Sequence, residues 1–389
     1  MFAQEVPEIS VLEYPVRVPR RVCLLIGQLG PGGAEKQVAV LGQGLRQRGV
    51  DVSVLVLFEG GPREESLRAA GVPVVSLGFR RRSAGWRMVP ANLAAFARLV
   101  RLLRRAHPDV VHAFLFHSYV IAAPAARLAR VPVVVAGRRS LGDFKQGRRA
   151  ALALERVVTR MTDLLVANAH AVAADTRRTE GVPDGKIAVV YNGLPAGAFD
   201  PAEPADVDTP LPVVLCVANL RTYKGHRYLL DAAALLRARG TPCTVVLAGD
   251  GSEGPALRRQ ARDLGLDVRF LGVRGDVERL LARADVVVLP SLTEGLSNAV
   301  MEAMAAGRPV VATDVGGTAE LLRGRGVLVP PGDPMALADG LHTLLSDPAE
   351  AARLAGAARA WSREHLRFDA MVDRHIAIYS NLLERRCAA

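Results

Sequence analysis

The chain has 389 residues, half of them hydrophobic, and a formal net charge of +11 at pH 7. This length predicts two domains, each with its own core, and the hydrophobic share excludes an intrinsically disordered protein. The charge is uneven, with +13 over residues 1–195 and −2 over the remainder. A basic first half suits an anionic lipid surface, a phosphate-bearing acceptor or nucleic acid, but it also fits arginines on solvated helix faces. No recognisable nucleic-acid-binding module is present, so we expect no nucleic-acid partner.

The cysteines and the apolar segments indicate the cellular compartment. The four cysteines fit neither a disulfide framework nor a zinc site and predict buried, reduced thiols in a cytoplasmic protein. They are Cys23, Cys216, Cys243 and Cys387. Residues 1–15 contain three glutamates and lack the apolar core of a signal peptide. The longest apolar run, residues 119–137, is interrupted by Arg127 and Arg130, so any contact with a membrane is expected from the side.

Strand-like apolar runs alternate with helix-like segments from the start of the chain, which is the pattern of parallel sheets in α/β domains. The runs are continuous and rich in Val and Leu, as expected of strands buried on both faces. In the first half we expect strands at residues 21–27, 51–57, 71–77, 109–114, 131–137, 163–168 and 186–193, and helices at about 34–48, 91–106 and 148–161.

A proline-rich stretch interrupts this alternation and predicts an interdomain linker at residues 195–210. The linker would separate a first domain, residues 1–194, from a second domain, residues 211–365, and from a last helix over 366–389 that packs back on the first domain. In the second half we expect strands at residues 212–219, 243–249, 268–272, 284–290, 309–314 and 326–330, with helices at about 225–239, 254–264 and 297–306 and over most of 334–385.

A glycine-rich turn, GQLGPGGAEKQ at residues 27–37, joins the first strand to the first helix. Such a turn lets backbone N–H groups approach an anion at a helix N-terminus. It lacks the GxGxxG pattern of dinucleotide sites and the Lys-Ser/Thr of a P-loop, which disfavours a Rossmann dehydrogenase. A tight turn that needs positive φ explains the glycines equally well.

Two cations follow the first strand of the second half. Arg221 and Lys224 lie where ligands bind in open parallel sheets, at the carboxyl end of a strand. Two cations there suit a diphosphate leaving group, whose negative charge grows as its bond breaks. A pair of surface cations beside a helix start is the plain alternative.

The segment LPSLTEGLSNAVMEAMAAGRPVVATDVGG, residues 289–317, is the most informative one. Glu294 is expected in the turn after a strand, and Glu302 about a turn and a half into the following helix. Gly295, Leu296 and Ser297 open that helix and can offer backbone N–H groups to an anion. A carboxylate at position 302 can accept two hydrogen bonds from a ribose diol. A hydrolase with paired carboxylates has the same spacing, so the alternative stays open.

Together these segments resemble the family 4 retaining glycosyltransferases of GT-B fold. The resemblance covers roughly residues 20–385 and is carried by Gly-Gly-Ala-Glu near the start, Asn-Gly before the linker, Lys-Gly at 224–225 and the segment from residue 289. It implies two Rossmann-like parallel-sheet domains that face a cleft, with the acceptor on the first domain and a nucleotide-sugar donor on the second. A UDP- or GDP-sugar donor, no metal and no cofactor are expected.

The resemblance also implies roles for individual residues. Glu302 would hold the ribose, and Glu294 would lie beside the donor sugar, with Gly295, Leu296 and Ser297 contacting sugar and phosphate through their backbone. Lys224 would bind the diphosphate. The remaining implied contacts are Gly32 and Gly33 in a loop that closes on the diphosphate, His112 near the reacting sugar carbon, and Val273 and Arg274 near the base. His117, five residues after His112, competes for the same role.

One position departs from the family pattern. Asn219 stands where many members have Arg. Arg221 lies two residues later, and alternation along an extended segment would point both side chains the same way. We therefore expect Arg221 to replace the family arginine.

Basic clusters in the first half are candidates for contact with a membrane or with an acceptor phosphate. The helix at 91–106 carries four arginines and either docks on anionic lipid or packs as an ordinary amphipathic helix on the sheet. The expected loops run over the surface and are the preferred candidates. Their residues are Arg80–Arg82 with Trp86, and Arg138, Arg139, Lys145, Arg148 and Arg149.

The expected function is transfer of a sugar from a nucleotide diphosphate donor to an acceptor hydroxyl, with retention at the anomeric carbon. The acceptor would be a growing polysaccharide, a lipid-linked glycan or a small natural product. The alternatives are a nucleotide-sugar epimerase or hydrolase of the same fold and a non-catalytic subunit that binds sugar nucleotides. A subunit without activity would have no need for Lys224, Glu294 and Glu302 together.

Overall fold

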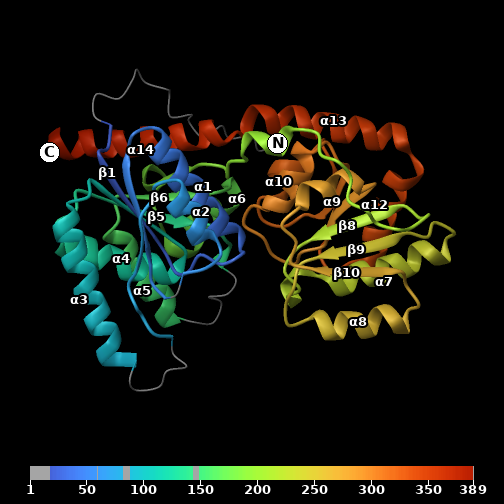
Figure 1. Ribbon diagram of the computed structural model, residues 1–389, viewed down its shortest axis with the longest axis horizontal. Helices are drawn as coiled ribbons and strands as arrows, with labels where there is room; N and C mark the ends of the chain where they lie inside the picture. Colours follow the sequence, from blue (N-terminus) through green and yellow to red (C-terminus); the bar gives the residue numbers. More distant parts are fainter. Residues whose placement is uncertain (1–17, 59, 82–87, 143–148, 389) are drawn as a thin grey trace. The chain divides into compact units, whose positions relative to one another are not determined.

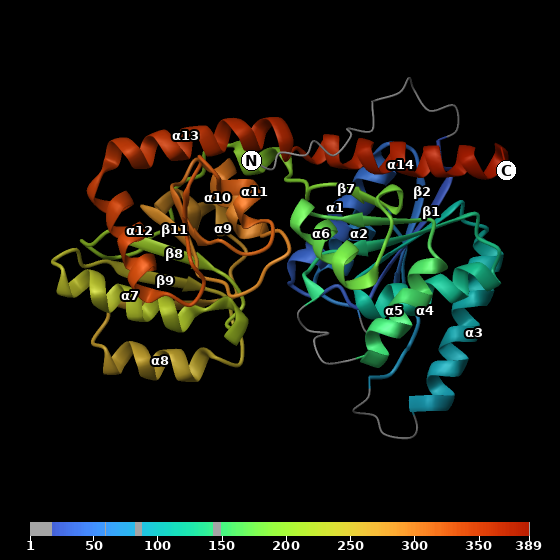
Figure 2. The same ribbon diagram turned by 180° about the vertical axis from the view of Figure 1, so that it is seen from behind.

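The computed structural model describes residues 18–58, 60–81, 88–142 and 149–388 (Figures 1 and 2). The chain forms two compact units, one from Met1–Gly137, Val157–Leu165 and Val372–Ala389 and the other from Arg138–Arg156 and Val166–Met371. Two parallel sheets, of seven and six strands, organise it. The expected α/β fold class with two Rossmann-like sheets is confirmed. The domain boundaries stay a prediction.

The first sheet has the strand order β3-β2-β1-β4-β5-β6-β7. Leu24 of β1 is aligned with Val54 on one side and with His112 on the other, so β1 lies between the two halves of the sheet. The chain order reverses at this point, and the crevice outside the carboxyl ends of β1 and β4 is where such sheets bind ligands. The strands are β1 (Arg21–Ile26), β2 (Asp51–Val56), β3 (Val74–Ser76), β4 (Val110–Phe114), β5 (Val133–Arg138), β6 (Leu164–Ala167) and β7 (Ile187–Val189).

In the part of the chain that the structure describes, six helices surround this sheet, and three of them were not expected from the sequence. The apolar residues of α4 surround the helix and include many buried alanines, so no 3.6-residue period marks it. The polar helix α2 buries only Leu67. The helices are α1 (Gly33–Gln47), α2 (Arg63–Ala69), α3 (Met88–Ala106), α4 (Phe116–Leu128), α5 (Arg149–Arg160) and α6 (His170–Glu180), of which α2, α4 and α6 were missed.

The last helix, α14 (Phe368–Ala388), packs along residues of the first sheet (Figure 1). The buried Tyr379 hydroxyl is 2.7 Å from Nδ1 of His112 on β4. Two ion pairs, Arg48 with Asp373 at 2.5 Å and Arg386 with Asp163 at 2.7 Å, flank this contact. These contacts tie the end of the chain to β4, to the end of α1 and to the residue before β6, all more than 200 residues away.

The second sheet has the strand order β10-β9-β8-β11-β12-β13, so its order reverses at β8. Its core is made of Val, Leu and Ala from the strands and from the helices that pack on them. The strands are β8 (Val213–Val217), β9 (Thr244–Ala248), β10 (Val268–Gly272), β11 (Val286–Leu289), β12 (Val310–Thr313) and β13 (Val327–Val329). The helices are α7 (His226–Ala238), α8 (Gly254–Asp263), α9 (Val277–Arg283), α10 (Asn298–Ala305), α11 (Thr318–Leu322), α12 (Pro334–Ser346) and α13 (Pro348–His365).

All six strands expected in the second half are present, whereas the short helices α9 and α11 were missed. All four cysteines are free thiols, and only Cys387 is exposed. Burial raises the pKa of the Cys216 thiol to about 12, against a smaller lowering by Lys224. Among the helices of the described residues, none combines the length and the apolar character needed to cross a bilayer.

Candidate active site

A lysine and a glutamate meet where the strand order of the second sheet reverses. Lys224 ends the short 3-10 turn Thr222–Lys224 after β8, and Glu294 lies in the loop after β11, which pairs with β8. The Lys224 ammonium donates a hydrogen bond to Oε1 of Glu294, and the Ser291 hydroxyl donates to the same oxygen at 2.9 Å. The two charged side chains are only 16% and 10% exposed. The reversal point is the usual ligand crevice of a doubly wound sheet, so this pair marks the candidate site.

The close contact between the loops of this site requires glycine at two positions. Gly225 has φ +69°, and a β-carbon there would lie 1.9 Å from the carbonyl oxygen of Pro290. Gly316 has φ +53°, and a β-carbon there would lie 1.9 Å from the carbonyl oxygen of Glu294. The backbone N–H of Leu292 also donates to the carbonyl of Tyr223 at 2.7 Å. Only glycine combines this backbone conformation with such a close approach, so the loops after β8, β11 and β12 form one packed layer.

Helix α10 begins beside Glu294. Ser297 caps it, because its hydroxyl accepts a hydrogen bond from the Val300 N–H at 3.4 Å. No described residue accepts a hydrogen bond from the backbone N–H groups of Gly295, Leu296 or Ser297. Glu302 lies in the second turn, half-buried. The start of α10 therefore presents donors for an anion, with a carboxylate one turn further on.

Arg221 reaches this edge by a route that differs from the expected one. The Arg221 N–H donates to the carbonyl of Asn219 at 2.8 Å, so the backbone turns across Leu220. The expectation of an extended segment with alternating side chains is wrong for this reason. Both Arg221 and Asn219 are exposed, and the Arg221 guanidinium is 3.3 Å from the Ser252 hydroxyl in the loop after β9. Whether Arg221 replaces the family arginine stays a prediction.

Val273 and Arg274 follow β10, the outermost strand on this side of the sheet. Val273 is 65% exposed. Arg274 donates two hydrogen bonds to the Asp276 carboxylate, at 2.8 and 2.6 Å. These bonds are the main reason why the pKa of Asp276 is lowered to about 2. Arg274 is thus held by a carboxylate, while Val273 offers an open apolar surface.

The glycine-rich turn of the first sheet follows β1. Gly32 caps α1, and its carbonyl accepts the N–H of Lys36 at 3.1 Å. The Glu35 carboxylate folds over the turn, since a β-carbon on Gly32 would lie 2.3 Å from its Oε2. Burial raises the pKa of Glu35. Gly33 is exposed at the first position of the helix. The turn therefore already holds one carboxylate at the helix N-terminus, which the sequence pattern did not indicate.

The two histidine candidates lie in different surroundings. His112 is fully buried on β4, its ring stacked on Phe114 at 4.0 Å and bonded to Tyr379. This is the arrangement of a core histidine. His117 is exposed in the first turn of α4, directly after the carboxyl end of β4. Leu115, which precedes α4, has φ +70°, a strained conformation that is common at functional sites.

The acceptor-side arginines also differ from expectation. The expectation that Arg138 lies on an exposed loop is wrong, because it is the last residue of β5 and its guanidinium forms a two-bond contact with Glu180, at 3.1 and 2.9 Å. Glu155 adds a second carboxylate at 3.7 Å, and all three side chains are buried. Arg139 is half-buried and donates to the Asn192 amide oxygen at 2.5 Å. Arg139 remains the only one of the two whose side chain reaches solvent.

Of the other basic candidates, two lie within the described residues. Arg80 and Arg81 are exposed, and Arg81 donates to the Gln28 side chain at 2.5 Å. Arg82, Trp86, Lys145, Arg148 and the side chain of Arg149 lie outside the described residues. Among the residues that the structure does describe, no three His, Cys, Asp or Glu side chains lie close enough together to hold a metal ion. Metal independence stays a prediction.

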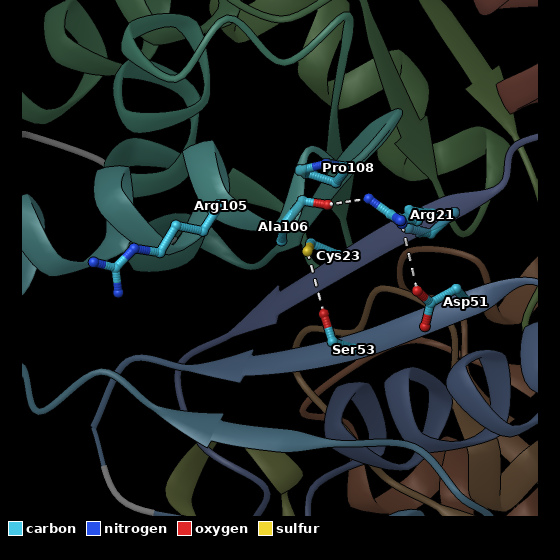
Figure 3. A pocket seen from close by; sticks show the side chains of 8 residues that line it. Arg21, Cys23, Asp51, Ser53, Arg105, Ala106 and Pro108 are labelled. Carbon is cyan, nitrogen blue, oxygen red and sulfur yellow. Dashed lines mark hydrogen bonds and ion pairs between the residues drawn. The ribbon is translucent and has the colours of Figure 1, made fainter.

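A hollow of about 360 Å³ opens at the amino ends of the strands of the first sheet, opposite to their carboxyl ends (Figure 3). It is lined by residues at the amino ends of β1 and β2, where Arg21 pairs with Asp51 at 3.6 Å and donates to the Ala106 carbonyl at 3.0 Å. Cys23 and Ser53 contact each other at 3.2 Å across its floor. Ligands bind parallel sheets at the carboxyl ends of their strands, so this hollow is not the candidate site.

His226, the first residue of α7, is a buried residue that no sequence pattern singled out. Its side chain is 2% exposed, and no described residue bonds to either ring nitrogen. Burial, with a smaller contribution from Lys224, lowers the pKa of His226 to about 4 from its ordinary 6.5. A histidine directly after Lys-Gly was the available signal, but its burial depends on packing that the sequence does not display.

This pKa makes stability depend on pH in a defined direction. As the pH falls below 6.5, the imidazole of His226 binds a proton in the unfolded chain, whereas in the folded chain it stays neutral until about pH 4. Relative to His226→Leu, the wild-type chain should therefore lose about 2 kcal/mol of unfolding free energy between pH 7 and pH 4.5. Denaturant melts of both proteins at the two pH values measure this. An equal loss in both would show that His226 does not titrate in this way.

Known proteins resemble the chain in sequence and in fold. The family described as "Glycosyltransferase Family 4" matches residues 31–196, and that described as "Glycosyl transferases group 1" matches residues 211–347. A D-inositol 3-phosphate glycosyltransferase of Xylanimonas cellulosilytica is 30% identical, over 92% of this chain and 93% of its own length. The lipopolysaccharide core biosynthesis glycosyltransferase LpsE of Rhizobium meliloti is 30% identical, over 83% and 88%.

Among solved structures, Anabaena Alr3699/HepE in complex with UDP-glucose superposes with a TM-score of 0.79 at 25% identity, over 92% of this chain and 98% of that one. The sequence match, the two sheets and the GT-B neighbour agree with one another. On these grounds, the chain belongs to the family 4 glycosyltransferases of GT-B fold.

Proposed function

We propose that the chain transfers a sugar from a nucleotide diphosphate donor to an acceptor hydroxyl, with retention at the anomeric carbon. The observation that carries this proposal is the contact between Lys224 and Glu294 at the reversal point of the second sheet, beside the open start of α10. A half-buried cation and a set of backbone donors on one edge suit a diphosphate, and a carboxylate between them suits sugar hydroxyls.

The proposed chemistry is mainly electrostatic. Lys224 and the N-terminus of α10 stabilise the charge that develops on the departing diphosphate, in a position where little water competes. Glu294 is already oriented by Lys224 and Ser291, so it can accept hydroxyl donors of the sugar without reorganisation. Glu302 accepts the ribose diol. These positive groups fulfil the task of a metal ion. The acceptor hydroxyl attacks the anomeric carbon from the face that the diphosphate leaves, the bond from that carbon to the diphosphate oxygen breaks, and the departing phosphate oxygen accepts the proton of the hydroxyl.

A UDP-sugar is the proposed donor, because the Anabaena neighbour is described with UDP-glucose. The acceptor is proposed to be a glycan or a lipid-linked glycan, in line with the lipopolysaccharide core activity named for the Rhizobium relative. A calorimetric screen with UDP-, GDP-, ADP- and TDP-sugars tests the donor. Donor breakdown at full rate without any acceptor would instead favour a hydrolase.

His117 is proposed as the acceptor-side histidine in place of His112. It is exposed at the carboxyl edge of the first sheet, whereas His112 is enclosed by Phe114 and Tyr379. An exposed imidazole there can exchange hydrogen bonds with a sugar hydroxyl. His112 instead couples β4 to α14.

The first functional prediction concerns Glu302. If it holds the ribose diol, Glu302→Ala weakens binding of the nucleoside diphosphate by about 1–3 kcal/mol, because polar groups of the ligand lose their partner. Isothermal calorimetry measures this. Glu278→Ala, which removes an exposed carboxylate from α9, is the matched control and should bind normally. Equal affinity in both variants would place Glu302 outside the nucleotide site.

The second prediction concerns the leaving group. Lys224→Ala lowers turnover roughly 10²–10³-fold, as for loss of one preorganised electrostatic partner. The variant also leaves Glu294 unpaired, so a melting curve must accompany the assay. Arg259→Ala, an exposed cation on α8, should keep full turnover. Arg221→Ala tested in parallel decides its own role, since near-normal turnover would mean that Arg221 does not replace the family arginine.

The third prediction separates the two histidines. His117→Ala reduces turnover by at least about 10²-fold with an unchanged melting temperature, as expected for a group that exchanges protons or hydrogen bonds with substrate. His112→Leu lowers the melting temperature because it breaks the buried bond to Tyr379. Turnover and thermal melts of both variants give the answer. A stable, inactive His112→Leu beside an active His117→Ala would reverse the assignment.

A further inference from the structure

The outer face of α3 combines apolar side chains with unpaired arginines. Ala95, Leu99 and Leu103 face the core, one turn apart. On the opposite side Val89 and Leu93 are 56% and 66% exposed, in the first half of the helix. The exposed arginines of its second half are Arg98, Arg101, Arg104 and Arg105. The helix is therefore buried on one side only, and the other side is divided into an apolar and a basic section.

The arginines of this face have no acidic partner. Arg101 and Arg104 donate only to backbone carbonyls, those of Ala97 and Leu128, and no described carboxylate pairs with Arg98 or Arg105. The sequences of α3 and its neighbour α4 contain no Asp or Glu at all. These four arginines therefore present uncompensated positive charge to solvent from a single helix.

The neighbouring helices extend the same character. Helices α3 and α4 lie side by side in both views (Figures 1 and 2). Leu128, at the end of α4 where Arg104 is bound, is 55% exposed. Val157 near the end of α5 is 52% exposed, and Arg160 follows it one turn later. Exposed apolar side chains and arginines thus also occur at the ends of α4 and α5.

We propose that this outer face of α3 docks the protein on an anionic lipid bilayer. Arginines that lack carboxylate partners are attracted to anionic headgroups, and each contributes about fivefold to the partition coefficient. The exposed Val89 and Leu93 can enter the boundary between headgroups and acyl chains, as the apolar face of an interfacial helix does. A soluble polyanion such as RNA would use the arginines but would gain nothing from these apolar side chains.

This inference deepens the proposed function and rests on it for its purpose, which is to bring a lipid-linked acceptor to the enzyme. It also changes the expected location of the docking surface. The sequence favoured the loops around residues 80–82 and 138–149, but Arg138 is buried against Glu155 and Glu180. The structure assigns the docking role to a helix that the sequence left open as an ordinary packed helix.

The test is co-sedimentation of the full chain with vesicles of phosphatidylcholine alone or with about one-third phosphatidylglycerol. Binding should require the anionic lipid and should decline at about 0.5 M salt, where screening is strong. Arg98→Ala with Arg101→Ala should lower the partition coefficient roughly 25-fold, at fivefold per arginine. Arg259→Ala with Arg262→Ala on α8 is the matched control, which removes the same charge from exposed, unpaired positions and should bind as wild type.

A second pair of variants tests the apolar contribution. Leu93→Ser should weaken vesicle binding several-fold, whereas Met335→Ser, at another exposed apolar position, should not. Wild-type protein that stays in the supernatant with anionic vesicles at low salt would overturn the proposal. Equal losses of vesicle binding in the two double arginine variants would also overturn it. The same holds if Leu93→Ser binds vesicles as well as the wild type does, while the α3 arginines govern binding to RNA.

Nucleotide calorimetry keeps this proposal separate from the function. Both arginine pairs lie outside the Lys224–Glu294 site, so UDP-sugar affinity should be unchanged in either. Loss of docking with normal nucleotide binding would refute only the membrane contact. Docking without any nucleotide binding in the wild type would refute only the proposed function.

Discussion

The ion pair of Lys224 and Glu294 is the interaction on which the candidate site depends. Both side chains are largely withdrawn from water, and desolvation of two such charges is costly unless each meets a well-placed partner. The pair and Ser291 supply those partners only because β8 and β11 are neighbours and their loops touch. Removal of either charge would leave the other buried, which typically costs about 3–5 kcal/mol. The site is therefore preorganised by the same contacts that join the loops.

The glycines of these loops serve the same arrangement. At positions 225 and 316 the backbone has positive φ, and a carbonyl oxygen lies where a side chain would begin. Close backbone packing brings the start of α10 beside the ion pair. The charge of Lys224 and the N–H groups of α10 are then directed at one place, which is how an enzyme stabilises a developing negative charge without reorganising at the moment of reaction.

The first sheet shows how one helix and one strand can serve two purposes. Helix α3 contributes Leu99 and Leu103 to the core and leaves an opposite face of arginines and apolar side chains. Strand β4 buries His112 against α14, and the turn that follows it exposes His117. In both elements the structural residues and the candidate functional residues are neighbours in sequence, separated by the periodicity of the element.

The sequence by itself determined the fold class, every strand of the described residues and the position of Lys224, Glu294 and Glu302 at strand ends and a helix start. Continuous Val-rich runs, Lys-Gly and the segment from residue 289 are local patterns, and parallel sheets place their strand ends at one edge. The helices α2, α9 and α11 were missed because they are short, and α4 because it is apolar all round. Helix α6 was missed because Asp175, Thr176 and Glu180 are among the residues it buries, so no apolar stripe marks it. Only the tertiary structure decided which histidine is buried, that Arg138 is held by two carboxylates and that His226 lacks a partner. Burial and pairing depend on contacts such as His112 with Tyr379, 267 residues apart, which no local pattern records.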